Sequence, residues 1–148
     1  MTMRFDIKLI GMIIAMVAIV NTGHVGFGDE KDPALPKKTS SILTVVRAMV
    51  CEDVKNLLPV NPTVVFSVEK EKAFCFAEIE GIVKSDTIYH DWIRRDAHVV
   101  GFKQVLKPPR WSTSSSITLR ETDKGPWRVE ITDMDGNILK ILRFSVVD

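Results

Sequence analysis

The stretch from Pro109 to Asp148 constrains the fold of this chain more than any other part of the sequence. Apolar and polar residues alternate along it, and turn signals at Gly125-Pro126 and Asp135-Gly136 divide it into short segments. Alternation with a period of two is the pattern of a strand that buries one face, and an Asp-Gly pair between apolar runs is a strong hairpin signal. The stretch therefore predicts the closing strands of an antiparallel sheet, with Trp127 facing the core.

Short strands are also predicted upstream, at Leu43–Cys51, Val64–Glu69, Ala73–Ile79, Thr87–Ile93 and Val99–Leu106. The short link Lys70–Lys72 predicts a hairpin between the second and third of these strands, and Arg95-Asp96 joins the last two. A short helix after Ala48 is the alternative for the first segment. Strands at this spacing, without a long helical pattern, predict an all-β fold: a small antiparallel, immunoglobulin-like β-sandwich of seven to eight strands.

The N-terminus has the pattern of an export signal. Arg4 and Lys8 precede an apolar run over residues 9–20, and small and polar residues follow up to Gly28. A basic start, a short apolar core and a small-residue exit are typical of a secretory signal peptide, and the run is shorter than the roughly 20 residues that cross a bilayer. We expect residues 1–28 to be a signal peptide, with an uncleaved anchor in the inner membrane through residues 9–20 as the alternative.

The rest of the chain divides into two parts. Residues 29–41 contain two prolines and many charges, a composition that buries too little apolar surface to fold. We therefore expect a disordered linker at 29–41 and a single folded domain at 42–148. The protein is expected in the periplasm or otherwise exported, touching a membrane only through its N-terminal segment.

Charge excludes one class of partner. Beyond residue 28 the basic and acidic residues balance, whereas nucleic-acid binding needs a basic surface that displaces counterions from phosphates. The basic residues between positions 94 and 110 lie among acidic ones and are interpreted as a solvated face.

The chain has two cysteines, Cys51 and Cys75, and both lie in the predicted domain. In an oxidising compartment an even pair favours a disulfide, which would stabilise the fold by roughly 3–4 kcal/mol in the chain-entropy account. Two buried free thiols that act as small apolar residues are the alternative.

Catalytic and metal-binding patterns are weak. His90 and His98 lie near Asp91 and Asp96, but no third ligand follows at a spacing that suits zinc. The serines between positions 112 and 116 lie in no nucleophile elbow, and Asp133–Asn137 lacks the later Glu of a calcium loop. We expect no enzyme activity, no cofactor and no metal.

The aromatic residues are the best candidates for a ligand site. Trp111, Trp92 and Tyr89, together with His90, are candidates for a surface that stacks on a sugar. The alternative is that the tryptophans fill the core, as large aromatics usually do. Trp111, which follows Pro108-Pro109 at a strand start, is the best candidate for exposure.

An ordered set of short motifs resembles one family. The motifs are His90-Asp91-Trp92, Trp111 with the Ser/Thr run after it, Gly125-Pro126-Trp127-Arg128-Val129, Asp135-Gly136 with Leu139, and Phe144-Ser145-Val146. Together they resemble the bacterial domain-of-unknown-function family 2914, over roughly Val45 to Val147. The chain departs from that family at Ser112 and Thr113, where a basic residue and an aromatic are usual. The resemblance implies a small β-rich domain, often exported or membrane-associated, and it implies no reaction.

Two functions follow as expectations. The first is a non-catalytic exported interaction module of the cell envelope, which binds a protein partner through a sheet edge or loop surface. The second is a carbohydrate- or peptidoglycan-binding module that uses the exposed aromatics on a cell-wall glycan. An enzyme based on His90 or His98 is a distant third.

Overall fold

The structure is a computed structural model that describes residues 42–148. The predicted signal peptide (1–28) and linker (29–41) lie outside the described residues. Among the described residues, no helix is both long and apolar enough to span a membrane.

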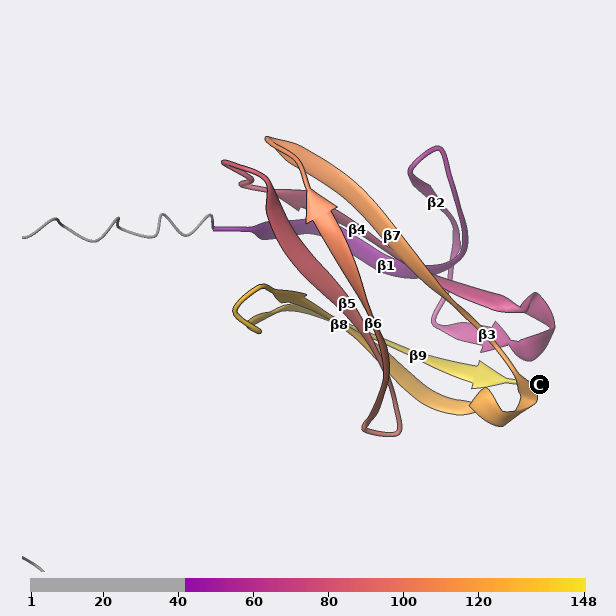
Figure 1. The fold of residues 1–148 in the computed structure, drawn as a ribbon. Helices are drawn as coiled ribbons and strands as arrows, with labels where there is room; N and C mark the ends of the chain where they lie inside the picture. Colours follow the sequence, from indigo (N-terminus) through magenta and orange to yellow (C-terminus); the bar gives the residue numbers. More distant parts are fainter. Residues whose placement is uncertain (1–41) are drawn as a thin grey trace, which may run out of the picture. The chain divides into compact units, whose positions relative to one another are not determined.

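Two sheets stack face to face (Figure 1). The first has four antiparallel strands in the order β2 (Leu58–Pro62), β1 (Thr44–Lys55), β4 (Lys72–Glu80) and β7 (Arg110–Thr118). The second has five strands in the order β3 (Val65–Ser67), β9 (Ile138–Val147), β8 (Gly125–Asp133), β5 (Asp86–Arg94) and β6 (Ala97–Leu106). Two short 3-10 helices complete the described part: η1 (Val68–Lys70) and η2 (Glu121–Asp123). The predicted all-β sandwich is confirmed, with nine strands in the described residues instead of seven or eight.

The core lies between the sheets and is built by the alternation that the sequence predicted. Trp127, Val129 and Ile131 of β8 are buried, whereas Arg128 and Glu130 between them are partly exposed. Phe144 of β9 is the centre of an aromatic cluster: it packs against Phe66, Trp92 and Trp127, with ring centroids 5.4–6.0 Å apart. Burial of side chains this large is the main favourable contribution to folding.

The turns confirm some predictions and correct others. β5 and β6 form the predicted hairpin, and its two turn residues, Arg95 and Asp96, both have positive φ (45° and 66°). Such a pair is the geometry of a type I′ turn, whose twist matches that of the flanking strands. β8 and β9 pair across the predicted Asp135-Gly136 turn, where Gly136 has φ 84°.

The hairpin predicted across Lys70–Lys72 is wrong. β3 and β4 lie in different sheets, because η1 and the left-handed Glu71 (φ 61°) turn the chain from one sheet to the other. β3 pairs instead with β9, in parallel. The alternative of a helix after Ala48 is also excluded, since β1 continues as a strand to Lys55.

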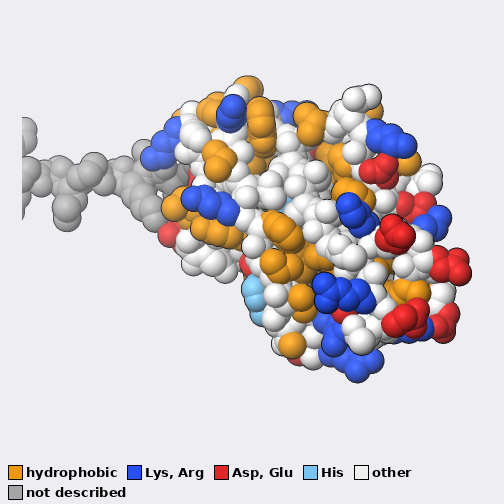
Figure 2. Space-filling model, turned by 45° about the vertical axis from the view of Figure 1, so that its right-hand side comes forward, with side chains coloured by type: hydrophobic (Ala, Val, Ile, Leu, Met, Phe, Trp, Pro, Cys, Tyr) orange, Lys and Arg blue, Asp and Glu red, His pale blue; other side chains and the backbone are white. Residues whose placement is uncertain are grey.

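Charges are interspersed on the surface. On the face shown in Figure 2, acidic side chains gather mostly along one edge, while basic side chains are spread among hydrophobic patches. On this face the basic side chains form no continuous stripe.

Candidate functional site: an open strand edge and an arginine pocket

One side of the sandwich leaves two strand edges open within residues 42–148. β2 pairs with β1 only at Cys51–Lys55, so Thr44–Val50 has β4 on one side and no strand on the other. β3 pairs with β9 only at Ser145–Val147, so Ile138–Phe144 has β8 as its single neighbour. β1 and β9 contact one another across the sandwich, and the two open edges therefore face the same side.

The chain crosses between the sheets at one end of these edges. Thr63 N donates to Val50 O of β1 at 3.2 Å, and Ser145 N of β9 donates to Val64 O at 2.9 Å. Next to this crossover lies an open groove of about 560 Å³, lined by Ala48, Met49, Val50, Pro62, Thr63, Val64, Ile141, Leu142 and Arg143. The lining is mostly apolar, and Arg143 is its one charged member.

Backbone groups of β9 point into the open side. The N–H of Ser145 reaches the β3 side, and successive residues of a strand turn their backbone polar groups to opposite sides. Arg143 and Ile141, two and four residues earlier, therefore turn their N–H and C=O groups to the same side, beyond the end of β3. Such a row of strand-edge groups is a template for pairing with another strand.

All charged side chains on the two open edges are basic. Thr44–Val50 contains Arg47, Ile138–Val147 contains Lys140 and Arg143, and neither segment has an acidic residue. Arg47 lies over the ring of Phe76 at 5.8 Å.

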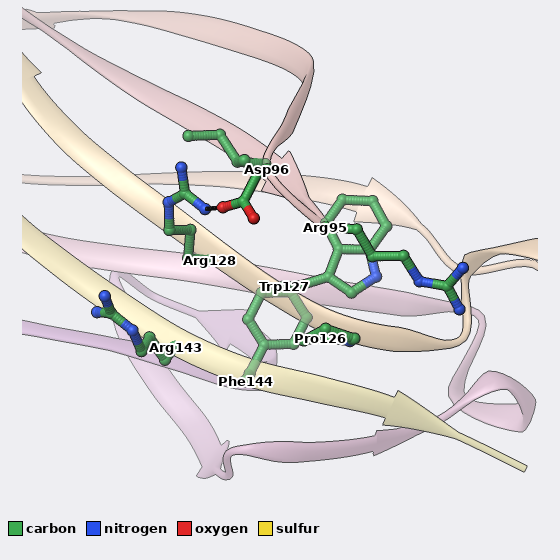
Figure 3. A pocket seen from close by; sticks show the side chains of 8 residues that line it. Arg95, Asp96, Pro126, Trp127, Arg128, Arg143 and Phe144 are labelled. Carbon is green, nitrogen blue, oxygen red and sulfur yellow. Dashed lines mark hydrogen bonds and ion pairs between the residues drawn. The ribbon is translucent and has the colours of Figure 1, made fainter.

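A second hollow, of about 270 Å³, adjoins the groove at Arg143. It is lined by Ile93, Arg95, Asp96, Pro126, Trp127, Arg128, Arg143 and Phe144 (Figure 3). Arg95 is held in place by its turn: its N–H donates to Pro126 O at 3.2 Å, and its guanidinium donates to Lys124 O at 3.3 Å. Gly125 has a φ of 118°, which favours glycine, and a Cβ there would lie 3.1 Å from Arg95 Nε, a tight approach.

The three arginines of this pocket differ in their partners. Arg128 donates to Asp96 at 2.6 Å and to Glu130 at 2.7 Å, and these carboxylates raise the pKa of its guanidinium. Arg143 stands directly opposite Arg128 in the β8–β9 ladder, yet no carboxylate among the described residues pairs with it (Figure 3). Like charges directly opposite each other on a sheet are destabilising, so an anion beside Arg143 would be stabilised.

Two of the predicted ligand-binding residues are buried in the core. His90 and Trp92 are both 0% exposed, because they lie on the face of β5 that packs against the other sheet. Trp92 Nε1 donates to Ser115 Oγ of β7 at 3.1 Å, and His90 Nδ1 lies 3.0 Å from the same oxygen. Desolvation lowers the pKa of His90 to about 4. This placement corrects the expectation that they form part of a surface aromatic platform.

Tyr89 and Trp111 are partly exposed but lie apart. Tyr89 alternates with His90 and so lies on the outer face of the five-stranded sheet, opposite Lys103. Trp111 belongs to the other sheet, packs against the core and has Lys107 Nζ 5.3 Å from its ring centroid. The predicted aromatic residues are thus not brought together on one surface.

The two cysteines are free and buried. In the β1–β4 ladder, Val50 is opposite Cys75 and Cys51 is opposite Phe74. This offset of one residue directs the two thiols to opposite faces of the sheet, which does not suit the geometry of a disulfide. Burial raises the pKa of both thiols. The disulfide expected from the sequence is therefore not formed.

The remaining titratable candidates form an outer-face cluster. Asp91 lies 3.1 Å from His98 Nε2 and accepts a hydrogen bond from Thr132 at 3.2 Å. Gly101 makes room for this carboxylate, since a Cβ there would lie 2.5 Å from Asp91 Oδ1. Within the described part of the chain, no group of three or more His, Cys, Asp and Glu residues is arranged to hold a metal ion.

Sequence reasoning missed the residues that line the open side. Arg143 and Ile141 look like ordinary strand residues, because their importance depends on where β3 ends beside β9. The one available signal was the lack of any acidic residue in Ile138–Val147, a strand that carries two basic ones.

Fold and site together define a small β-sandwich domain in which the open edge of β9 lies beside an arginine pocket. Residues 85–146 match the family described as "Protein of unknown function (DUF2914)", which confirms over this range the resemblance inferred from the sequence. The matched range contains Arg95, Arg128 and Arg143. No significant match is found among curated proteins.

Proposed function

We propose that this protein is a non-catalytic interaction module of the cell envelope that binds an extended segment of a protein partner by adding it as a strand to β9. The proposal of an envelope location is supported by the sequence pattern of residues 1–28. In strand addition, main-chain hydrogen bonds provide affinity, and pockets for alternate side chains provide specificity.

The observation that carries the proposal is the open edge at Ile141 and Arg143. β3 occupies the edge of β9 only at Ser145–Val147, so an added strand would continue the line of β3 along the same edge. Its inward side chains would enter the groove lined by Val50, Val64 and Leu142.

The edge of β1 is less suitable. A register shift between Val45 and Arg47 places an extra residue, Val46, in this strand. Such a bulge twists an edge away from pairing and is a common protection against strand addition. The corresponding irregularity of β9 lies at Leu139, and pairing is regular from Lys140 to Val146.

The test replaces Ile141 by proline. Proline removes the N–H that faces the open side, and it is tolerated on edge strands because that N–H has no ladder partner. Ile141→Ala is the matched control, because it also removes the side chain but keeps the N–H. The full chain and both variants are used to select from a displayed library of ten-residue peptides, after circular dichroism has verified their fold.

We expect peptides selected by the unchanged protein to bind Ile141→Ala and to lose binding to Ile141→Pro by at least about tenfold, the size of one or two lost hydrogen bonds. Hydrogen exchange should slow at the amides of Ile141 and Arg143 when a peptide binds. Equal binding to both variants, or selection of no peptide at all, would refute strand addition at β9.

A further inference from the structure

We infer that the segment bound at β9 alternates apolar and acidic residues, and that one of its carboxylates binds Arg143. This inference rests on the proposed strand addition and specifies the chemistry of the partner. It follows from the two hollows that meet at Arg143, one mostly apolar and one basic.

The apolar requirement comes from the groove. Side chains of an extended segment alternate between its two faces, so every second residue of the added strand would face the space between the sheets. Val50 and Leu142, which line that space, are buried, and Val64 is an exposed apolar residue at its rim. An apolar side chain placed there would be stabilised by its removal from water.

The acidic requirement comes from the other face. In the added strand, the residues that alternate with the inward-facing ones would point outward, on the same face of the sheet as Arg143. Arg128 is already paired with Asp96 and Glu130, and Arg95 is bound to a backbone carbonyl. Among residues 42–148, Arg143 therefore has the guanidinium of the pocket that no other group binds, and Arg128 directly opposite adds to the positive potential there.

The same charges disfavour a second copy of the chain as the occupant. Two β9 edges in contact would bring Lys140 and Arg143 of each copy together, with no carboxylate on either strand. An acidic segment is the complement of this edge, and like-charge contact is a common means of excluding wrong partners.

The probe is a capped eight-residue peptide that alternates Val and Glu and carries a fluorophore. Peptides that alternate Val with Gln and Val with Lys are its comparisons. Binding to the full chain is measured by fluorescence anisotropy, and Arg143→Gln is compared with Lys103→Gln, a control that removes an exposed charge from β6 of the same sheet.

We expect the Glu peptide to bind at least about tenfold more tightly than the Gln peptide, the size of one charge-assisted hydrogen bond, and the Lys peptide to bind more weakly than either. Arg143→Gln should lower the affinity for the Glu peptide to that for the Gln peptide, and Lys103→Gln should leave it unchanged.

Equal affinities for the Glu and Gln peptides, both lost in Ile141→Pro, would overturn the acidic preference and leave strand addition intact. An unchanged preference for Glu in Arg143→Gln would also overturn it. Binding that persists in Ile141→Pro but depends on Arg143 would refute strand addition and leave a simple anion site. Dimerisation of the free protein that Ile141→Pro abolishes would show that a second copy occupies the edge.

Discussion

At the scale of single residues, His90 is the most unusual member of the core. It lies within hydrogen-bond distance of Ser115 through Nδ1, while its Nε2 is buried and has no hydrogen-bond partner among residues 42–148. Because burial disfavours the imidazolium, the pKa of His90 falls to about 4, well below its ordinary value. Protonation therefore favours the unfolded chain, because its imidazole binds a proton that the buried His90 of the folded domain does not bind.

The sign of the resulting pH dependence follows from linkage. Between about pH 6.5 and pH 4 the unfolded chain binds the proton and the folded domain does not, so stability falls as the pH falls. We expect His90 to contribute a loss of about 3 kcal/mol across this range, measured by urea unfolding at several pH values. His90→Gln should remove this part of the slope, and the exposed His98→Gln should retain it. The same slope in both variants would refute the assignment to His90.

At the scale of elements, the tightest turns are built from residues with left-handed backbone. Asn56 and Leu57, with φ of 50° and 57°, join β1 to β2. Asparagine suits such a position, whereas a leucine there is strained by about 1–2 kcal/mol and exposes 59% of its surface.

Leu57→Gly should therefore stabilise the domain. It creates Asn-Gly, the preferred pair for a type I′ turn, and the relief of strain exceeds the backbone entropy that glycine loses on folding. We expect a gain of about 0.5–1 kcal/mol in the free energy of unfolding, measured with urea. Leu58→Gly, one residue later in β2, should lower stability instead. If both variants are destabilised, the strain at Leu57 is not significant.

Local patterns predicted where the strands lie better than they predicted which strands pair. The alternation of Trp127, Val129 and Ile131, and the Arg95-Asp96 and Asp135-Gly136 turns, depend on contacts close in sequence, and the structure confirms them. The hairpin across Lys70–Lys72 was wrong because a short link fixes the distance between two strands but not whether they pair. Here the left-handed Glu71 turns the chain into the other sheet.

The candidate site was less predictable for a related reason. The aromatic residues were singled out by type, but alternation along β5 directs Trp92 and His90 inward and Tyr89 outward. The open edge depends on where β3 stops along β9, which no local pattern encodes. Whether Cys51 and Cys75 form a disulfide could not be predicted, because it depends on a one-residue offset between them in the β1–β4 ladder.

At the scale of the whole molecule, the two buried thiols test whether the domain unfolds as a single cooperative unit. Cys75 lies in the core and Cys51 lies on the other face of the same sheet, and both are fully buried. We expect both to react with 5,5′-dithiobis(2-nitrobenzoic acid) only through global unfolding, and therefore at the same rate. Leu57→Gly should slow both reactions in proportion to its gain in stability. Rapid labelling of one thiol would show that its part of the sheet opens independently.

The parallel pair of β3 and β9 also has a consequence for how the domain is made. Of the strands within residues 42–148, β3 is among the first to leave the ribosome, whereas its partner β9 is the last. β9 also separates β3 from β8 in the five-stranded sheet. The sheet cannot close, and Phe144 cannot join the aromatic cluster, until the segment up to Val147 has been synthesised. The nascent domain therefore stays open until β9, the partner of β3, has been synthesised.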